Sequence, residues 1–447
     1  MSSRKSIARR LTVAVLAGRF GKDSILERTL PLIQGSPTWL KRFVDQLIRR
    51  FGNQRPKRSY VLAFLLSNRE FIDASLNEDF DVQPYLLPSE FSPSPGNFEA
   101  IDVIRLRSSG EVAAWLKLNE NELSWFADRH QLERLSTVGP LRHYRYFWKL
   151  KRHGRCRLIE APKFRMREIQ RRLLREILSR IPVHNAAHGF RRGRSANSHA
   201  APHVGRSVVL KLDLEDFFPS VPPMRLTRLL MHTGYPEDVA EILTALCCNH
   251  VPSDVFDSFP HRDDWKLRRR AKQLYCRPHI PQGAPTSPVI ANLCAYRLDT
   301  RLAGLAQSAN ATYTRYADDL LFSGDDQFSR GIDRFRILAA AIAMEEGFAV
   351  NHHKTRVMKR SIRQEAVGLV LNEKINTRRD EFDRLKATLH RCILKGPEAV
   401  NCGQHAHFRQ HLIGRIQHIA QSSQSRHTKL MALFDQINWS DPQSPST

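Results

Sequence analysis

The sequence predicts a mixed α/β (α+β) protein, with strands near the centre of the chain and helices on both sides. Residues 207–221, SVVLKLDLEDFFPSV, combine β-branched residues with alternation, which is typical of a strand. Residues 312–324, TYTRYADDLLFSG, indicate two short strands with a turn at Ala317 and Asp318. Apolar residues recur at helical spacing in four other segments: 36–51, 164–181, 379–394 and 407–420.

The composition favours a folded protein with a polyanionic partner. The 447 residues are 41% hydrophobic, enough for a core in more than one domain. Lys and Arg number 70 against 45 Asp and Glu, a formal net charge of +25. Such an excess is typical of nucleic-acid binding, because each neutralised phosphate releases condensed counterions. It does not separate RNA from DNA, and an anionic membrane surface remains the alternative.

The seven cysteines form no small-scaffold pattern, so we expect reduced thiols in a cytoplasmic protein. CCNH (247–250) and CRPH (276–279) offer zinc-ligand types, but no CxxC pair accompanies them, which favours ordinary half-buried side chains. The apolar run 11–18 is too short to span a bilayer. Arg9 and Arg10 beside it could belong to a twin-arginine export signal, yet no clear cleavage site follows, so a basic amphipathic helix is favoured.

The first 60 residues are rich in Lys and Arg and contain the predicted helix 36–51, for which Ser36 supplies a cap and Pro37 suits the first turn. The charge becomes acidic between residues 70 and 90. Residues 86–97, LLPSEFSPSPGN, are then typical of a linker. We therefore expect a basic helical extension and linker over residues 1–95.

The strand predicted at 207–221 places leucines on one face and Lys211 and Asp213 on the other, and Pro219 is expected to end it. Asp318 and Asp319 occupy the predicted turn. If neighbouring strands bring these three carboxylates together, they form a hard oxygen site of the kind that Mg²⁺ prefers. Two such ions can clamp the attacking and leaving oxygens of a phosphoryl transfer. The alternative is a solvated turn and an incidental strand end.

Five motifs give the sequence a resemblance to the reverse transcriptases, over roughly residues 105 to 440. They are LDLEDFF (212–218), PQGAPTSP (281–288), YADD (316–319), GFAVNHHKT (347–355) and VGLVLN (367–372). The chain most resembles the retron type. AHGFRRGRSANSHAAPH (187–203) is similar to the block in which retron enzymes carry an Asn-Ala-x-x-His element. This chain has His199-Ala200-Ala201-Pro202-His203 in its place. AVGL (366–369) stands where retron enzymes often show Val-Thr-Gly.

The resemblance implies a right-hand polymerase with fingers, a palm sheet that carries the catalytic aspartates, and a helical thumb. We expect the fingers over residues 96–205 and the palm over 206–372, with a fingers insertion at about 225–280. The thumb and C-terminal tail would follow over 373–447.

The resemblance also implies roles for individual residues. Asp213, Asp318 and Asp319 would be catalytic and would bind the metal together with the backbone carbonyl of Leu214. Phe218 would exclude a ribose 2′-hydroxyl, although Phe217 and Phe218 could both be core residues.

Other residues would bind the nucleotide or the RNA. Gln282 and Gly283 would contact the nascent base pair or template. Arg157, with Arg155 and Lys163 nearby, would grip the triphosphate, or would simply form a basic hairpin face. Lys354 would serve the departing pyrophosphate, or be solvated. RNA contacts would come from Arg194, His199 and His203, although the two histidines could instead be core residues.

The function implied is RNA-directed DNA synthesis with Mg²⁺ and deoxynucleoside triphosphates. A structured non-coding RNA would supply both the template and a 2′-hydroxyl primer, giving branched RNA–DNA and an RNA–DNA hybrid. A role in antiphage defence with an effector protein would follow, without a membrane. The alternatives are another prokaryotic reverse transcriptase, of abortive-infection or group II intron origin, and a non-catalytic RNA-binding scaffold.

Overall fold

The computed structural model describes most of the chain. The described residues are 4–34, 38–52, 54–76, 80–83, 90–96, 98–129, 132–135, 142–150, 156–261, 264–403 and 405–439. The predicted cap Ser36 and Pro37, much of the predicted linker, Arg155 and the C-terminal tail lie outside them. Among the described helices, none is long and apolar enough to cross a bilayer.

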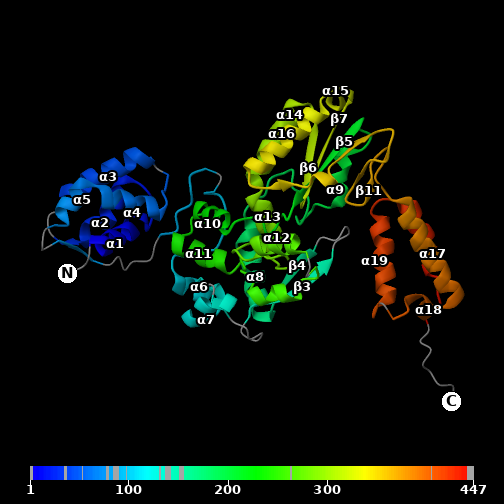
Figure 1. Ribbon diagram of the computed structural model, residues 1–447, viewed down its shortest axis with the longest axis horizontal. Coiled ribbons are helices and arrows are strands. Elements are labelled where there is room, and N and C mark those ends of the chain that lie inside the picture. The colour runs from blue at the N-terminus through cyan, green and yellow to red at the C-terminus, as the bar shows by residue number, and fades with distance from the viewer. Residues whose placement is uncertain are drawn as a thin grey trace, which may run out of the picture. The chain divides into compact units, whose positions relative to one another are not determined.

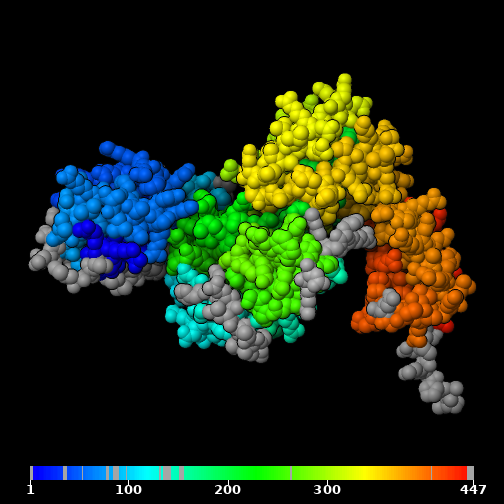
Figure 2. Space-filling model, viewed as in Figure 1, coloured from blue at the N-terminus to red at the C-terminus, as the bar shows by residue number. Residues whose placement is uncertain are grey.

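The chain divides into two compact units, which are drawn in Figure 1 and as space-filling atoms in Figure 2. Unit 1 comprises residues 1–181 and 222–287, and unit 2 comprises residues 182–221 and 288–447. The chain therefore passes between them more than once, and each unit is built from segments distant in sequence.

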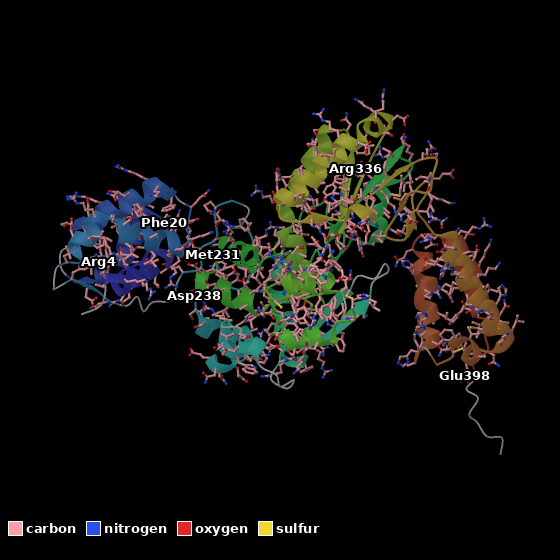
Figure 3. All side chains as sticks on the ribbon, in the orientation of Figure 1. Arg4, Phe20, Met231, Asp238, Arg336 and Glu398 are labelled. Atoms are coloured by element: carbon pink, nitrogen blue, oxygen red, sulfur yellow. The ribbon has the colours of Figure 1, made fainter. Side chains whose placement is uncertain are left out.

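Unit 1 begins with a helical bundle that has its own core. Its helices are α1 (Arg4–Leu16), α2 (Lys22–Thr29), α3 (Thr38–Phe51), α4 (Arg58–Ser67) and α5 (Arg69–Ala74). A short ladder pairs β1 (Ile33–Gln34) with β2 (Asp81–Val82). Phe20, labelled in Figure 3, and Phe43 belong to the apolar cluster inside the bundle. The predicted helix 36–51 is confirmed from Thr38 onward.

The rest of unit 1 contains an antiparallel hairpin of β3 (Tyr144–Leu150) and β4 (Cys156–Pro162). The helices are α6 (Ser109–Leu116), α7 (Glu120–Ala127), α8 (Phe164–Glu176), α10 (Pro223–His232), α11 (Glu237–Ala245) and α12 (Trp265–Tyr275). The helix predicted at 164–181 is shorter than expected. Ile177 leaves the helical backbone region, and a single 3₁₀ turn, Leu178–Arg180, follows.

Unit 2 is organised around an antiparallel sheet. Its five strands are β5 (Val208–Glu215), β6 (Thr312–Tyr316), β7 (Asp319–Gly324), β8 (Ala349–Val350) and β9 (Arg356–Lys359). β7 pairs with both β6 and β5, while β8 and β9 pair with β5. The strand predicted at 207–221 ends at Glu215, before Pro219, because Asp216 adopts a left-handed conformation (φ 47°) and Ser220 N–H donates to its carbonyl.

Helices accompany this sheet and form the C-terminal part of unit 2. They are α9 (Ala196–Ala200), α13 (Ser287–Cys294), α14 (Tyr296–Ser308), α15 (Asp326–Arg330), α16 (Ile332–Glu345), α17 (Arg379–Lys395), α18 (Pro397–Asn401), α19 (Phe408–Ala420) and α20 (Gln424–Phe434). A small sheet joins β10 (Glu365–Ala366), β11 (Leu369–Val370) and β12 (Asn376–Thr377). The helices predicted near 379–394 and 407–420 are confirmed, and leucines and isoleucines of α17, α19 and α20 share one core.

Candidate active site

The sheet of unit 2 brings Asp213, Asp318 and Asp319 to one place. In the antiparallel register of β5 and β7, Asp213 lies directly opposite Asp319. Tyr316 pairs with Asp319 at the end of the β6–β7 hairpin, so Ala317 and Asp318 form its two-residue turn, as predicted. Leu214 N–H donates to the Asp318 carbonyl at 2.9 Å, which ties the turn to β5. Residues about a hundred positions apart therefore share one end of the sheet.

The turn itself is tightly held. Ala317 has a φ of 55°, a conformation that costs a residue with a Cβ atom about 1 kcal/mol or more. Gly189 passes so close that an added Cβ would lie 2.7 Å from the Ala317 nitrogen. Asn292 Nδ2 donates to the Gly189 carbonyl at 2.8 Å and keeps this segment in place. The turn that contains Gly189 thus supports the aspartate turn from one side.

A buried ion pair supports the turn from beneath. Arg315 and Asp299 are both fully buried, and two guanidinium nitrogens of Arg315 each lie 2.7 Å from an Asp299 carboxylate oxygen. Arg315 also donates to Asn292 Oδ1 at 2.8 Å and to the Ala317 carbonyl at 3.1 Å. No local pattern in the sequence predicted this ion pair. Its signal was a charged residue, Asp299, in an otherwise apolar helical stripe with Leu298 and Leu302.

Two lysines lie on the carboxylates. Lys354 Nζ is 3.0 and 2.9 Å from the two carboxylate oxygens of Asp213. Lys211 Nζ is 2.9 and 3.0 Å from those of Asp319. The Lys354 side chain is half exposed, whereas that of Asp213 is buried. Alternation along the strand anticipated that Lys211 shares the face of Asp213, but its contact with Asp319 depends on the register between strands.

The electrostatics of the site favour a cation. Burial raises the pKa of Asp318, and the charges of Asp319 and Asp213 raise it further. Burial also raises the pKa of Asp319, although Lys211 opposes that shift. Carboxylates crowded in a buried place are destabilised as anions unless positive charge approaches them.

The donor chemistry fits a hard divalent ion, but no finished metal cage is present. Within the described part of the chain, no three His, Cys, Asp or Glu side chains are grouped closely enough to hold a metal. Residues 247–250 and 276–279, the alternative zinc site, are among the residues to which this finding applies. At the aspartates, lysine ammonium groups satisfy two of the three carboxylates instead. An ion that prefers oxygen ligands would have to take the place of Lys354 on Asp213 and draw the carboxylates together.

The two aromatic residues that follow β5 differ in burial. Phe217 is buried and packs on Phe348, with the Arg315 guanidinium 5.5 Å from its ring centre. Phe218 is partly exposed, and its ring centre lies 6.2 Å from that of the half-exposed Phe190. Phe218 therefore remains accessible near the end of β5, while Phe217 belongs to the core.

Gln282 and Gly283 belong to unit 1, where a buried network holds their loop. The Glu160 N–H donates to the Gln282 carbonyl at 2.9 Å, and the Gln282 N–H donates to Glu160 Oε1 at 3.4 Å. Gly283 has a φ of 134°, and an added Cβ would lie 2.8 Å from the Glu160 carbonyl. The buried Glu160 carboxylate accepts from His279 Nε2 at 2.9 Å and from Asn249 Nδ2 at 2.7 Å. No local pattern in the sequence predicted this network of Glu160, His279 and Asn249.

The remaining predicted residues lie in different environments. Arg157 is partly buried on β4 of unit 1, opposite Lys149, and Arg194 is exposed in unit 2. His199 and His203 are fully buried, and both bond the Thr314 hydroxyl, at 2.7 and 2.8 Å. Their direct contact with RNA was predicted wrongly. Burial lowers the pKa of both rings, so they are neutral core residues beneath the sheet.

We expect Gly189→Ala to impair DNA synthesis with little change in overall folding. Its methyl group would press on the backbone of the aspartate turn, and displacements of that kind cost about 10- to 100-fold in rate. Steady-state primer extension and the unfolding temperature should be measured together. The matched control is Gly304→Ala on α14, where an added Cβ meets nothing within 4 Å. Wild-type activity in Gly189→Ala would contradict this role for the close contact.

Comparison with known proteins shows the family to which the chain belongs. The sequence pattern of the family described as "Reverse transcriptase (RNA-dependent DNA polymerase)" matches residues 149–370. The "Retron Mx65 reverse transcriptase" of Myxococcus xanthus is 42% identical over 314 residues, covering 70% of this chain and 68% of that protein. The chain therefore belongs to the reverse transcriptases, the RNA-directed DNA polymerases, and among them to the retron type.

Two further relatives are more distant. The "Retron Mx162 reverse transcriptase" of Myxococcus xanthus is 35% identical over 300 residues, which cover 64% of this chain and 59% of that protein. The "Retron Ec86 reverse transcriptase" of Escherichia coli is 28% identical over 344 residues, 76% of this chain and 94% of that protein. The chain thus spans most of the Escherichia coli relative and about three fifths of the Mx162 enzyme.

Proposed function

We propose that the chain copies a structured non-coding RNA into DNA at the carboxylate site formed by Asp213, Asp318 and Asp319. The observation that carries the proposal is the register of β5 and β7, which sets Asp213 opposite Asp319 and beside the turn that holds Asp318. In a right-hand polymerase these strands belong to the palm, over residues 206–372 with a fingers insertion at about 225–280. Fingers over 96–205, a thumb over 373–447 and a basic extension over 1–95 complete the proposed division.

The aspartates would hold Mg²⁺ through their carboxylates and the Leu214 carbonyl. When bound, divalent ions would activate the primer hydroxyl and stabilise charge on the leaving pyrophosphate. Lys354 would leave Asp213 as the site fills and turn to the pyrophosphate, which its half-exposed side chain permits. Lys211 would remain beside Asp319 and offset part of the negative charge of the three carboxylates.

Four further residues would bind and select the nucleotide. The Gln282–Gly283 loop, held by Glu160, would contact the nascent base pair through backbone and amide groups. Arg157 would bind the triphosphate, for which a guanidinium offers paired donors. Phe218, accessible where Phe217 is not, would occupy the space of a ribose 2′-hydroxyl.

The proposed role of Phe218 predicts a loss of sugar selectivity on substitution. We expect Phe218→Val to raise ribonucleotide incorporation relative to deoxynucleotide incorporation by about 10- to 100-fold. The measurement is the ratio of kcat/KM for the two nucleotide types on one primer–template. Phe217→Leu, which alters the buried neighbour, should lower the unfolding temperature without changing that ratio. Unchanged selectivity in Phe218→Val would exclude the ring as the sugar gate.

The partner would be a dedicated RNA that supplies the template and a 2′-hydroxyl primer, so that the product is branched RNA–DNA. The hybrid product would lie against the helices after residue 373, where an A-like duplex is recognised by its shape, sugars and phosphates. Exposed Arg194 would add an RNA contact. Antiphage defence, with a separate effector, is the biological role that we propose for this product in the cytoplasm.

The proposal is tested by the nucleic acid that purifies with the protein. Extraction, nuclease digestion and sequencing should recover one RNA species joined to DNA by a bond that resists RNase. Asp318→Asn protein should retain the RNA without the DNA. Recovery of RNA without DNA from both proteins would instead support a non-catalytic RNA-binding scaffold, and a mixture of unrelated RNAs would favour a reverse transcriptase of another type.

A further inference from the structure

Helix α12 of unit 1 carries several positive charges and no negative charge. Its eleven residues, WKLRRRAKQLY, contain Lys266, Arg268, Arg269, Arg270 and Lys272 and no acidic residue. Like charges four positions apart, as in Lys266 and Arg270, face each other along a helix and destabilise it by about 0.2–0.5 kcal/mol per pair. The helix is therefore under electrostatic repulsion that a bound polyanion would relieve.

Packing determines which side of α12 faces outward. Ala271 and Tyr275 are buried in the core that also contains Leu158, Phe256 and Phe259. Tyr275 closes this contact through its carbonyl, which accepts from Val251 N–H at 3.1 Å. The helix is thus anchored along one side, and its orientation does not depend on its charged residues.

The opposite side of α12 carries an ordered stripe. Lys266, Arg269 and Lys272 follow one another at three-residue spacing, and all three are exposed. Lys272 lies at the border of the packed side, with its Nζ 5.9 Å from the centre of the Phe256 ring. The stripe extends about 9 Å along the helix axis, comparable with about three stacked nucleotides. None of the three forms an ion pair with another residue in the described ranges, whereas Arg268 is paired with Asp257 at 3.3 Å.

An exposed tryptophan stands at the start of the stripe. Trp265 is 62% exposed, and Lys266 Nζ lies 5.8 Å from the centre of its ring. A large aromatic side chain beside phosphate-binding cations is the combination that proteins use for unpaired RNA bases, which stack on the ring.

We propose that this surface, the α12 face formed by Trp265, Lys266, Arg269 and Lys272, binds the structured RNA of the enzyme. The three cations contact consecutive phosphates of the RNA backbone, and an unpaired base stacks on Trp265. This inference rests on the proposed function for the identity of the RNA. It adds a docking surface in unit 1, whereas the aspartates belong to unit 2.

The test compares RNA binding with DNA synthesis in two variants. Lys266→Gln/Arg269→Gln/Lys272→Gln should weaken affinity for the co-purifying RNA by roughly tenfold or more near 0.15 M salt, and should reduce the salt dependence by about two to three released ions. Trp265→Ala should weaken affinity by about fivefold or more with the salt dependence unchanged. Both should extend a short unstructured RNA–DNA primer–template at the wild-type rate, because the α12 face is not part of the carboxylate site.

The matched control removes the same charge elsewhere. Arg330→Gln/Arg334→Gln/Arg336→Gln alters exposed cations of α15 and α16, where Arg336 is labelled in Figure 3, and should leave RNA affinity within about twofold of wild type. Equal losses in the two triple variants would reduce the effect to net charge and overturn the proposal. Wild-type RNA affinity in both α12 variants would also overturn the proposal. This holds even if the variants lose a bound protein, because the α12 face would then bind protein and not RNA. Failure of the proposed function would appear differently, as wild-type protein that binds RNA and extends no primer.

Discussion

Asp318→Asn is expected to reduce DNA synthesis by roughly 10³-fold or more while leaving RNA binding intact. The substitution keeps the size of the side chain and removes one of three charges that would hold divalent ions. Burial and the neighbouring carboxylates already raise the pKa of Asp318, so the neutral amide should be tolerated by the fold. Single-turnover primer extension at saturating nucleotide measures the loss directly.

The control for that substitution is an aspartate on the helix that follows β7. Asp326→Asn changes an exposed carboxylate in the first turn of α15, beyond the other end of β7. It should extend primers at the wild-type rate. If Asp318→Asn retained more than about a tenth of wild-type activity, the turn carboxylate would not be a metal ligand in the reaction.

The second large effect concerns stability. Asp299→Ala would leave the guanidinium of Arg315 buried without its carboxylate, and breaking a buried pair in this way costs about 3–5 kcal/mol. We expect the free energy of unfolding to fall by that amount in denaturant titrations. A variant as stable as wild type would show that the pair does not hold unit 2 together.

A double variant separates stability from positioning. Asp299→Leu/Arg315→Met removes both charges, and an apolar pair of similar volume often restores the stability that one substitution loses. DNA synthesis should stay low, because Arg315 no longer donates to the Ala317 carbonyl of the aspartate turn. Full recovery of both stability and activity would leave Arg315 with a purely structural role.

The sequence predicted the strands that carry the aspartates, but it did not predict the buried polar groups that hold those strands and loops in place. Alternation placed Lys211 and Asp213 on one face of β5, and the turn at Ala317 and Asp318 followed from the pattern of two short strands. That these elements are neighbours came from the resemblance, because sequence spacing alone does not order strands in a sheet. The central geometry was therefore predictable, while the pairing register had to be observed.

The supports depend on tertiary packing, which local patterns do not record. Arg315 fits the alternating pattern of its strand. The sequence around it does not show that Asp299 of α14 lies within hydrogen-bond distance of its guanidinium. In the sequence, Glu160 lies among basic residues of the predicted hairpin, and nothing there indicates that His279 and Asn249 donate hydrogen bonds to it in the fold. The same reason explains the incorrect prediction for His199, since a polar ring on a short helix is exposed or buried according to what covers it.

The central claim is that three aspartates on neighbouring strands bind divalent ions for nucleotidyl transfer. Its most direct test is electron paramagnetic resonance of Mn²⁺ bound to the protein with primer–template and a non-reactive deoxynucleotide analogue. Wild-type protein should bind Mn²⁺ at this site, and Asp213→Asn should lose that bound Mn²⁺ while still binding the primer–template. Equal Mn²⁺ binding by the two proteins would contradict the account.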